Sequence, residues 1–267
     1  MNAGSDVIAF IPGWGFKSSI GKQYLHQICN TFIDLPDPWG LSDLPDLWIP
    51  SDTSTSNPDL KSCSIENVCR HMEAALSGRR RMILLGWSLG GLIAVNLYHR
   101  KPENYKAMIL VNFTPCFSKG VRWPGISLSN QRIFTDNLEQ PYQTFVTYYL
   151  SLMAYPYPSS LVSSAMLATG AGIETHLISE ALIHRYKAYV TILFQTDARR
   201  QYVGIKIPAL LIQGSKDPII PSSIHSYLKK LNPSVDYRCI EGAGHVPFVS
   251  HSKETHRLIQ NFLETVL

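Results

Sequence analysis

The stretch MILLGWSLGG, residues 82–91, contains the motif Gly-x-Ser-x-Gly between an apolar run and a segment of helical character. In this arrangement Ser88 occupies a tight turn from strand to helix, and Gly86 and Gly90 leave room for backbones packed close to it. The Ser88 hydroxyl would project above a sheet at a helix N-terminus, where developing negative charge is favoured. The motif therefore predicts a nucleophilic serine on a strand-turn-helix unit.

On both sides of this motif, short apolar runs alternate with helical stretches. This alternation is typical of a parallel sheet covered by helices on both faces, which places the chain in the α/β class. The expected strands are residues 6–11, 31–35, 82–86, 107–111, 209–213 and 235–240. The expected helices are residues 21–30, 64–76, 89–100, 222–231 and 253–266.

Two segments interrupt the alternation. Residues 34–64 are rich in Pro, Asp, Ser and Thr and read as a long surface loop. Residues 115–201 have helical periodicity and little strand character, so we expect a helical lid inserted in a core made of residues 1–114 and 202–267. The lid aromatics either form its own core or line an acyl pocket. The pocket candidates are Phe117, Trp123, Phe145 and Tyr149.

A serine nucleophile needs a histidine base and a carboxylate that orients the base. Asp217 follows the strand expected at 209–213, and His245 follows the last expected strand, so both lie at carboxyl ends of strands. Asn112 follows the strand expected at 107–111, where a carboxylate sometimes supplies the acid, but an amide cannot serve in that role. We therefore predict the triad Ser88, Asp217 and His245.

The oxyanion formed during acyl transfer needs two positioned N–H donors. One donor is expected to be the backbone amide of Leu89, directly after the nucleophile. The second should come from the loop IPGWGF, residues 11–16, after the first strand, and the amide of Trp14 is the best candidate. The alternative is that Pro12 and Gly13 form a simple tight turn.

Composition excludes several other classes. The formal net charge of +4 comes with no dense Lys/Arg run, so we expect no nucleic-acid binding. Residues 82–99 are uncharged but contain three glycines and read as strand, turn and helix rather than a membrane span. No His/Asp/Glu cluster has metal-ligand spacing, and no Gly-rich segment matches a nucleotide motif, so neither metal nor cofactor is expected. Five scattered cysteines, with no secretory signal ahead of them, favour a cytoplasmic protein, which we expect to be a monomer.

Five short motifs can be compared with known families: GWG (13–15), GWSLGG (86–91), TPCFS (114–118), WPGI (123–126) and GHVPFVSH (244–251). They resemble those of the alpha/beta hydrolases, and within that family those of the pimeloyl-[acyl-carrier protein] methyl ester esterases of biotin synthesis. Hydrolases in general share the first motifs, whereas the motifs that contain Pro-Cys-Phe and Trp-Pro-Gly-Ile are more specific. One departure is Pro12, which stands where that family usually has His.

The resemblance implies that Ser88, Asp217 and His245 form the triad, and that Trp14 and Leu89 supply the oxyanion donors. It also implies a four-helix lid around an acyl channel, and a substrate that is a pimeloyl methyl ester held on acyl-carrier protein. In the family, lid arginines grip the acidic carrier. The early part of the lid here has few basic residues, Arg122 and Arg132. The carrier-docking candidates are the four late ones, Arg185, Lys187, Arg199 and Arg200. Ordinary solvated charges are the alternative interpretation.

Two other functions remain open from the sequence. The same triad could serve a broader short-chain ester hydrolase, a thioesterase or an acyltransferase. A non-catalytic hydrolase-fold protein that binds a ligand or partner is the third hypothesis. A complete triad in the order Ser, Asp, His argues against it, because a pure binding protein gains nothing from all three residues.

Overall fold

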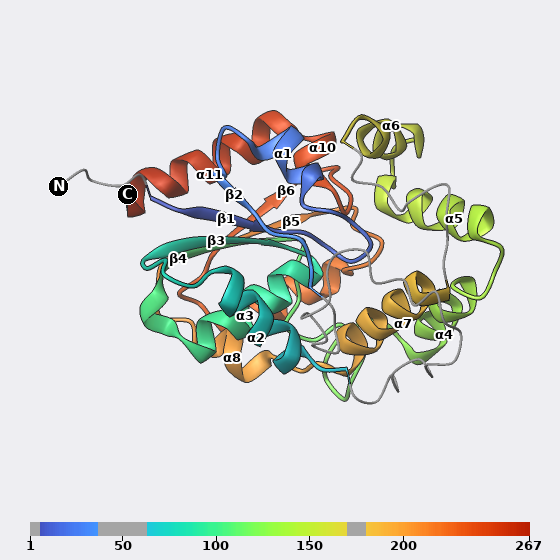
Figure 1. The fold of residues 1–267 in the computed structure, drawn as a ribbon, viewed down its shortest axis with the longest axis horizontal. Helices are drawn as coiled ribbons and strands as arrows, with labels where there is room; N and C mark the ends of the chain where they lie inside the picture. Colours follow the sequence, from blue (N-terminus) through green and yellow to red (C-terminus); the bar gives the residue numbers. More distant parts are fainter. Residues whose placement is uncertain (1–5, 37–62, 170–179) are drawn as a thin grey trace.

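A computed structural model describes residues 6–36, 63–169 and 180–267. Within these ranges six parallel strands form one sheet in the order β2-β1-β3-β4-β5-β6 (Figure 1). The strands are β1 Ile8–Ile11, β2 Thr31–Phe32, β3 Met82–Trp87, β4 Tyr105–Val111, β5 Ala209–Gly214 and β6 Asp236–Ile240. All six lie where the sequence predicts strands, and the α/β class is confirmed.

The central strands are continuous apolar runs because helices cover both of their faces. Every residue of β1, β3 and β5 is buried. Their register aligns Phe10 with Leu85 and Leu85 with Ile109. The edge strand β2 ends at Phe32, before the predicted end of residue 35, and its continuation reaches Pro36, which has no N–H to donate to a ladder.

Helices cover the two faces of the sheet (Figure 1). One face carries α2, α3 and α8, and the other carries α1, α10 and α11. The bounds are α1 Ser19–Leu25, α2 Ile65–Ala75, α3 Leu89–Arg100, α8 Arg199–Val203, α9 His225–Leu231, α10 Pro247–Ser250 and α11 Ser252–Val266. The helix predicted at 222–231 is a 3-10 turn, Ser222–Ile224, followed by α9. The α3 helix is buried along most of its length, as expected for the helix that presents Ser88.

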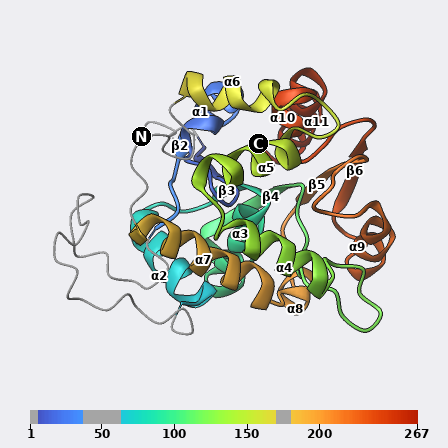
Figure 2. The ribbon, with the colours of Figure 1, turned by 90° about the vertical axis from the view of Figure 1, so that its right-hand side faces the viewer.

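Four further helices of the described ranges lie between β4 and β5 in the chain, beyond one end of the sheet (Figures 1 and 2). They are α4 Leu128–Asn137, α5 Tyr142–Ala154, α6 Ser160–Thr169 and α7 Glu180–Gln195. The predicted lid boundary after residue 201 falls inside α8, which packs against α3 of the core. The lid limits of 115–201 stay a prediction.

Other expectations fall partly or wholly outside the described ranges. Most of the predicted surface loop at 34–64 lies there, because residues 37–62 are not described. No helix of the described ranges is long and apolar enough to cross a bilayer.

Candidate active site

The turn that bears Ser88 has an unusual backbone. Ser88 has φ 54° and ψ −116°, a conformation that is strained for a residue with a side chain. A Cβ at Gly90 would lie 2.2 Å from the Ile11 carbonyl oxygen, and one at Gly86 would lie 2.5 Å from the Gly90 carbonyl oxygen. The backbone N–H of Ser88 donates to the carbonyl of Val111 at 2.9 Å. The two glycines therefore allow the close packing that keeps Ser88 at the end of β3.

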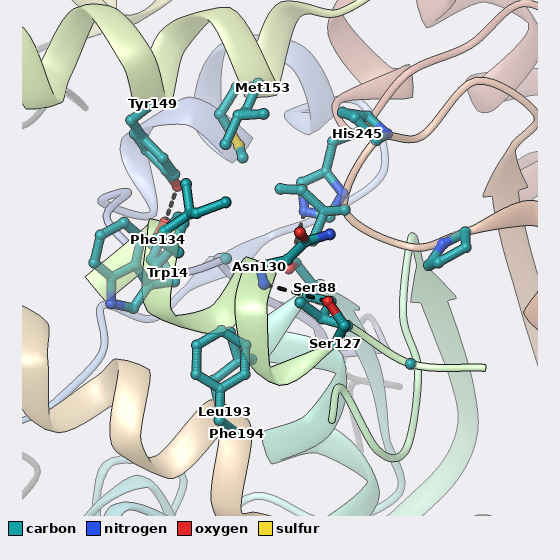
Figure 3. A pocket seen from close by; sticks show the side chains of 18 of the residues that line it. Trp14, Ser88, Ser127, Asn130, Phe134, Tyr149, Met153, Leu193, Phe194 and His245 are labelled. Atoms are coloured by element: carbon teal, nitrogen blue, oxygen red, sulfur yellow. Dashed lines mark hydrogen bonds between the residues drawn. The ribbon is translucent and has the colours of Figure 1, made fainter. Parts of the chain in front are cut away.

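The three predicted triad residues lie together and form one hydrogen-bonded chain. The Oγ of Ser88 is 3.0 Å from Nε2 of His245, and both residues are drawn in Figure 3. Nδ1 of His245 is 2.7 Å from Oδ2 of Asp217. The other carboxylate oxygen of Asp217 accepts from the amides of Ile219 at 2.8 Å and Ile220 at 3.0 Å. His245 is 1% exposed and Asp217 is 7% exposed, so water does not compete strongly for these bonds.

This order of contacts matches that of an acyl-transfer triad. The carboxylate of Asp217 accepts from Nδ1 of His245, which assigns the ring proton to Nδ1. The Nε2 atom is then the acceptor that faces the Ser88 hydroxyl. The geometry is therefore suited to removing the Ser88 proton and stabilising the resulting imidazolium.

The expected oxyanion donors lie on either side of the nucleophile. Leu89 is the first residue of α3, where unpaired amides and the helix dipole favour negative charge. Trp14 lies in the loop after β1 and lines the cavity together with Gly13. Their roles as donors stay a prediction.

Trp14 is held by the lid helices. Its indole N–H donates to the backbone carbonyl of Tyr186 at 3.1 Å. Its own carbonyl accepts from the hydroxyl of Tyr149 (Figure 3). Its ring lies 5.2 Å from the ring of Phe134 and 5.0 Å from that of Tyr149, both edge-on. Burial raises the pKa of Tyr149 well above its ordinary value, which keeps the hydroxyl protonated as a donor. The lid is thus joined directly to the expected oxyanion loop.

A cavity of about 420 Å³ extends from Ser88 and His245 between the core and the lid (Figure 3). Most of its wall is aromatic or aliphatic, and a smaller part from residues 119–130 is polar. It is lined by Gly13, Trp14, Trp87, Ser88, Lys119, Gly125, Ile126, Ser127, Asn130, Ile133, Phe134, Tyr148, Tyr149, Leu152, Met153, Leu193, Phe194, Pro218, Ile219, Pro221 and His245. Such a largely apolar site with a few polar groups suits an acyl chain that ends in an ester.

Of the four predicted pocket residues, only Tyr149 is in this wall. Phe145 stacks on Tyr149 with ring centroids 5.8 Å apart and packs edge-on against Trp14, so it supports the wall from behind. Phe117 is fully buried, and the indole of Trp123 donates to the carbonyl of Cys116 at 2.7 Å. Phe117, Trp123 and Phe145 are therefore packing residues next to the cavity rather than part of its lining.

The sequence interpretation missed the contribution of α4. Asn130, Ile133 and Phe134 line the cavity from this helix. Their spacing of three and four residues marks one helix face, which is the sequence signal that identifies them. The sequence interpretation also missed a structural role of Asn112. Its side chain is bonded to Gly214 and Gly244, in the loops that carry Asp217 and His245.

Three of the four predicted carrier-docking residues already have partners within the chain. Arg185 donates to the carbonyls of Leu35 and Pro36. The Lys187 ammonium is 2.6 Å from the carboxylate of Glu139. Arg199 is paired with the carboxylate of Asp197 and also lies over the Trp123 ring. Arg200 is exposed on α8. The four therefore do not form one free basic surface.

Among the described residues, no group of three or more His, Cys, Asp or Glu side chains is arranged to hold a metal ion.

Comparison with known proteins agrees with the fold. A pimeloyl-[acyl-carrier protein] methyl ester esterase of Yersinia pseudotuberculosis serotype O:1b (strain IP 31758) is 25% identical, over 96% of this chain and 93% of that protein. The protein of the same name from Wigglesworthia glossinidia brevipalpis is 29% identical, over 99% of this chain and 96% of its own length. An esterase structure from Exiguobacterium antarcticum superposes with a TM-score of 0.75 at 15% identity, over 97% of this chain and 92% of the other. The family profile described as the alpha/beta hydrolase fold matches residues 50–252, and the chain belongs to that family.

Proposed function

We propose that this chain is a serine carboxylesterase that hydrolyses the methyl ester of a pimeloyl group bound to acyl-carrier protein, releasing methanol. The observation that supports a hydrolase most strongly is the buried chain of contacts from Ser88 through His245 to Asp217 at the edge of an apolar cavity. The relatives that match nearly the whole chain support the choice of ester.

The reaction proceeds in two acyl-transfer steps. Nε2 of His245 removes the proton of Ser88 as Oγ attacks the ester carbonyl, and the amides of Trp14 and Leu89 bind the oxyanion. The intermediate collapses, the carbon–oxygen bond to the methoxy group breaks, and the leaving oxygen takes the proton from His245. Water then attacks the acyl-Ser88 ester with His245 again as the base, which returns the free carboxyl group and the free serine.

The cavity supports an extended acyl substrate. Its volume of about 420 Å³ lies in the range of small-molecule sites, roughly 300 to 1,000 Å³. Phe134, Leu152 and Leu193 supply apolar surface at which methylene groups are removed from water. An ester at Ser88 with its chain along this wall keeps the far end of the chain free for attachment to a carrier.

We place the carrier on the rim formed by residues 119–133 rather than on α7 and α8. Lys119, Arg122 and Arg132 are exposed there, and Lys119 also lines the cavity. The same segment carries two exposed apolar side chains, Val121 at 92% and Leu128 at 71%. Basic groups around apolar contacts complement an acidic carrier whose attached chain enters the cavity.

A cytoplasmic monomer remains part of the proposal. None of the five cysteines, all of which lie in the described ranges, forms a disulfide, which is the usual state in a reducing compartment. Four of them are buried, and only Cys239 is exposed. Sedimentation in a reducing buffer tests the oligomeric state, and a stable dimer would contradict this part.

The substrate assignment is tested by comparing kcat/KM for methanol release from carrier-bound pimeloyl methyl ester with kcat/KM for short p-nitrophenyl esters. We expect the carrier-bound ester to be the better substrate, and the gene to restore growth of a biotin-requiring mutant that lacks the esterase. If the short free ester reacts as well or better, the carrier substrate is rejected. A broader ester hydrolase, a thioesterase or an acyltransferase with the same triad then becomes the better assignment.

A further inference from the structure

The carboxyl end of β4 contacts the loops that carry all three triad residues, although no triad residue belongs to β4. The carbonyl of Val111, the last residue of β4, accepts from the backbone N–H of Ser88 at 2.9 Å. The next residue, Asn112, has its backbone N–H bonded to the carbonyl of Ile212 in β5 at 2.8 Å. This point of the sheet therefore lies between the serine turn and the strand that leads to Asp217.

The side chain of Asn112 extends the connection to the histidine loop. Its Oδ1 accepts from the backbone N–H of Gly214 at 2.7 Å, and its Nδ2 donates to the carbonyl of Gly244 at 2.7 Å. Gly214 ends β5 and its carbonyl accepts from the amide of Asp217, whereas Gly244 directly precedes His245. Asn112 is fully buried and has φ 42°, a left-handed conformation that asparagine tolerates better than most residues.

Other bonds join the acid loop and the histidine loop to each other. The amide of Lys216 donates to the carbonyl of Ala243 at 2.9 Å, and the amide of Gly242 donates to the hydroxyl of Ser215 at 2.9 Å. These bonds do not involve β4, whose last residue accepts from the backbone N–H of Ser88. The Asn112 side chain is bonded to both loops at once and ties them to that strand.

We propose that Asn112 is a positioning residue, which sets the separation of His245 from Ser88 by holding the acid loop and the histidine loop against β4. This inference rests on the proposed function, because it concerns the same triad. The role needs one acceptor and one donor on a short planar group, which is what a carboxamide supplies. Asn112 is not in the cavity wall, so its influence is expected on reaction rate and not on substrate binding.

A second asparagine provides a matched control. Asn232 lies between α9 and β6, is 6% exposed, and is not in the cavity wall. Its Nδ2 donates to the carbonyl of Tyr202 at 2.8 Å, and its Oδ1 accepts from the amide of Ser234 at 3.2 Å. Its side chain therefore makes the same two kinds of bond to main-chain groups as Asn112, without contacting a triad loop.

The test compares Asn112→Asp and Asn112→Ala with Asn232→Asp and Asn232→Ala. All four are expected to lower the melting temperature, because each removes a buried donor. The measured rate is that of Ser88 labelling by a fluorophosphonate, per folded molecule, together with kcat and KM for a p-nitrophenyl ester. We expect both Asn112 variants to be labelled about 10- to 100-fold more slowly with KM unchanged, because a small misplacement of the reacting groups slows the reaction without weakening binding. Both Asn232 variants should label at the wild-type rate.

The pH dependence of Asn112→Asp gives a signature that loss of packing does not produce. A carboxylate at this position cannot donate to the Gly244 carbonyl, but a protonated carboxyl can. Burial raises the pKa of such a carboxyl. The labelling rate of Asn112→Asp relative to wild type should therefore rise as the pH falls, whereas the relative rate of Asn112→Ala should stay constant.

Equal labelling rates per folded molecule for the Asn112 and Asn232 variants would overturn the inference. So would an increase in KM with kcat unchanged. If either Asn112 variant does not fold, Asn112→Ser, which keeps a hydroxyl at the site, is measured in the same way and with the same criterion. A wild-type protein that the fluorophosphonate does not label would instead reject the proposed function, so the two failures are distinguishable.

Discussion

The two walls of the cavity are built in different ways. The wall formed by the sheet consists of loops fixed by buried hydrogen bonds, such as those from Ser88 to His245 and from Asn112 to Gly244. The wall formed by the lid is held largely by aromatic contacts around Trp14. Its helices α5 and α6 contain no charged residue, and α4 leaves Leu128 and Ile133 exposed at 71% and 51%. The sheet wall positions the reacting groups, and the lid wall determines the shape of the cavity.

This difference predicts separate effects of mutation. Hydrogen-bond geometry at the triad acts on the transition state, so changes there should lower kcat by orders of magnitude. Aromatic contacts are individually small and adaptable, so changes in the lid should alter KM or stability by modest factors.

Ser88→Ala removes the nucleophile from the sheet wall. We expect kcat for ester hydrolysis to fall by about a million-fold, as in other triads, because the covalent step is lost. The protein should keep its melting temperature, since the alanine leaves the sheet and its loops in place. Near-normal turnover by purified Ser88→Ala would remove Ser88 from the mechanism.

Gly90→Ala tests the packing beneath the nucleophile turn. The added Cβ would lie 2.2 Å from the Ile11 carbonyl oxygen, so the backbone must shift. We expect a loss of stability of about 1–3 kcal/mol, measured by urea denaturation, together with slower labelling of Ser88. Gly78→Ala provides a comparison in open space, although its φ of 76° adds strain of its own. A stable, fully active Gly90→Ala would show that the turn does not need this close approach.

Tyr149→Phe tests the connection between the two walls. It removes the hydroxyl that donates to the Trp14 carbonyl while keeping the ring contacts. We expect a loss of about 0.5–1.5 kcal/mol in stability and a small decrease in kcat, as for one hydrogen bond. Tyr148→Phe, in the neighbouring tyrosine of the cavity wall, is the control. If both variants behave alike, the bond to the oxyanion loop has no role of its own.

The single variants Arg122→Glu and Arg132→Glu test the proposed carrier surface. We expect KM for the carrier-bound ester to rise by about 3- to 10-fold at low salt, with no change for a free p-nitrophenyl ester, because surface charge acts mainly on encounter. Arg257→Glu on α11 is the matched charge reversal on another helix. The same increase in all three variants would mean that net charge, and not this rim, is responsible.

The sequence predicts the sheet wall far better than the lid wall. The predicted α/β hydrolase fold is confirmed. It could be predicted because a strand-turn-helix motif and alternating elements are local patterns in the sequence. The three triad residues meet because parallel strands bring their carboxyl ends to one edge. For Asn112 the sequence shows only that an amide is not an acid. Its bonds to Gly214 and Gly244 join positions 102 and 132 residues apart, which no local pattern contains.

The lid shows where sequence periodicity stops being informative. Periodicity marks Phe145 and Tyr149 as one buried face, but it does not tell which ring meets the cavity and which supports it from behind. Likewise, charge alone does not reveal that Arg185 is bonded to the carbonyls of Leu35 and Pro36. Both answers depend on how the lid packs against distant segments.

The central claim is that Ser88 is the covalent nucleophile of an ester hydrolase. Mass spectrometry of the protein after reaction with a fluorophosphonate tests it directly. We predict a phosphonyl adduct on the peptide that contains Ser88, and no adduct in Ser88→Ala or in heat-denatured protein. Labelling that persists in Ser88→Ala at the wild-type rate, or an adduct on another residue, would contradict the account.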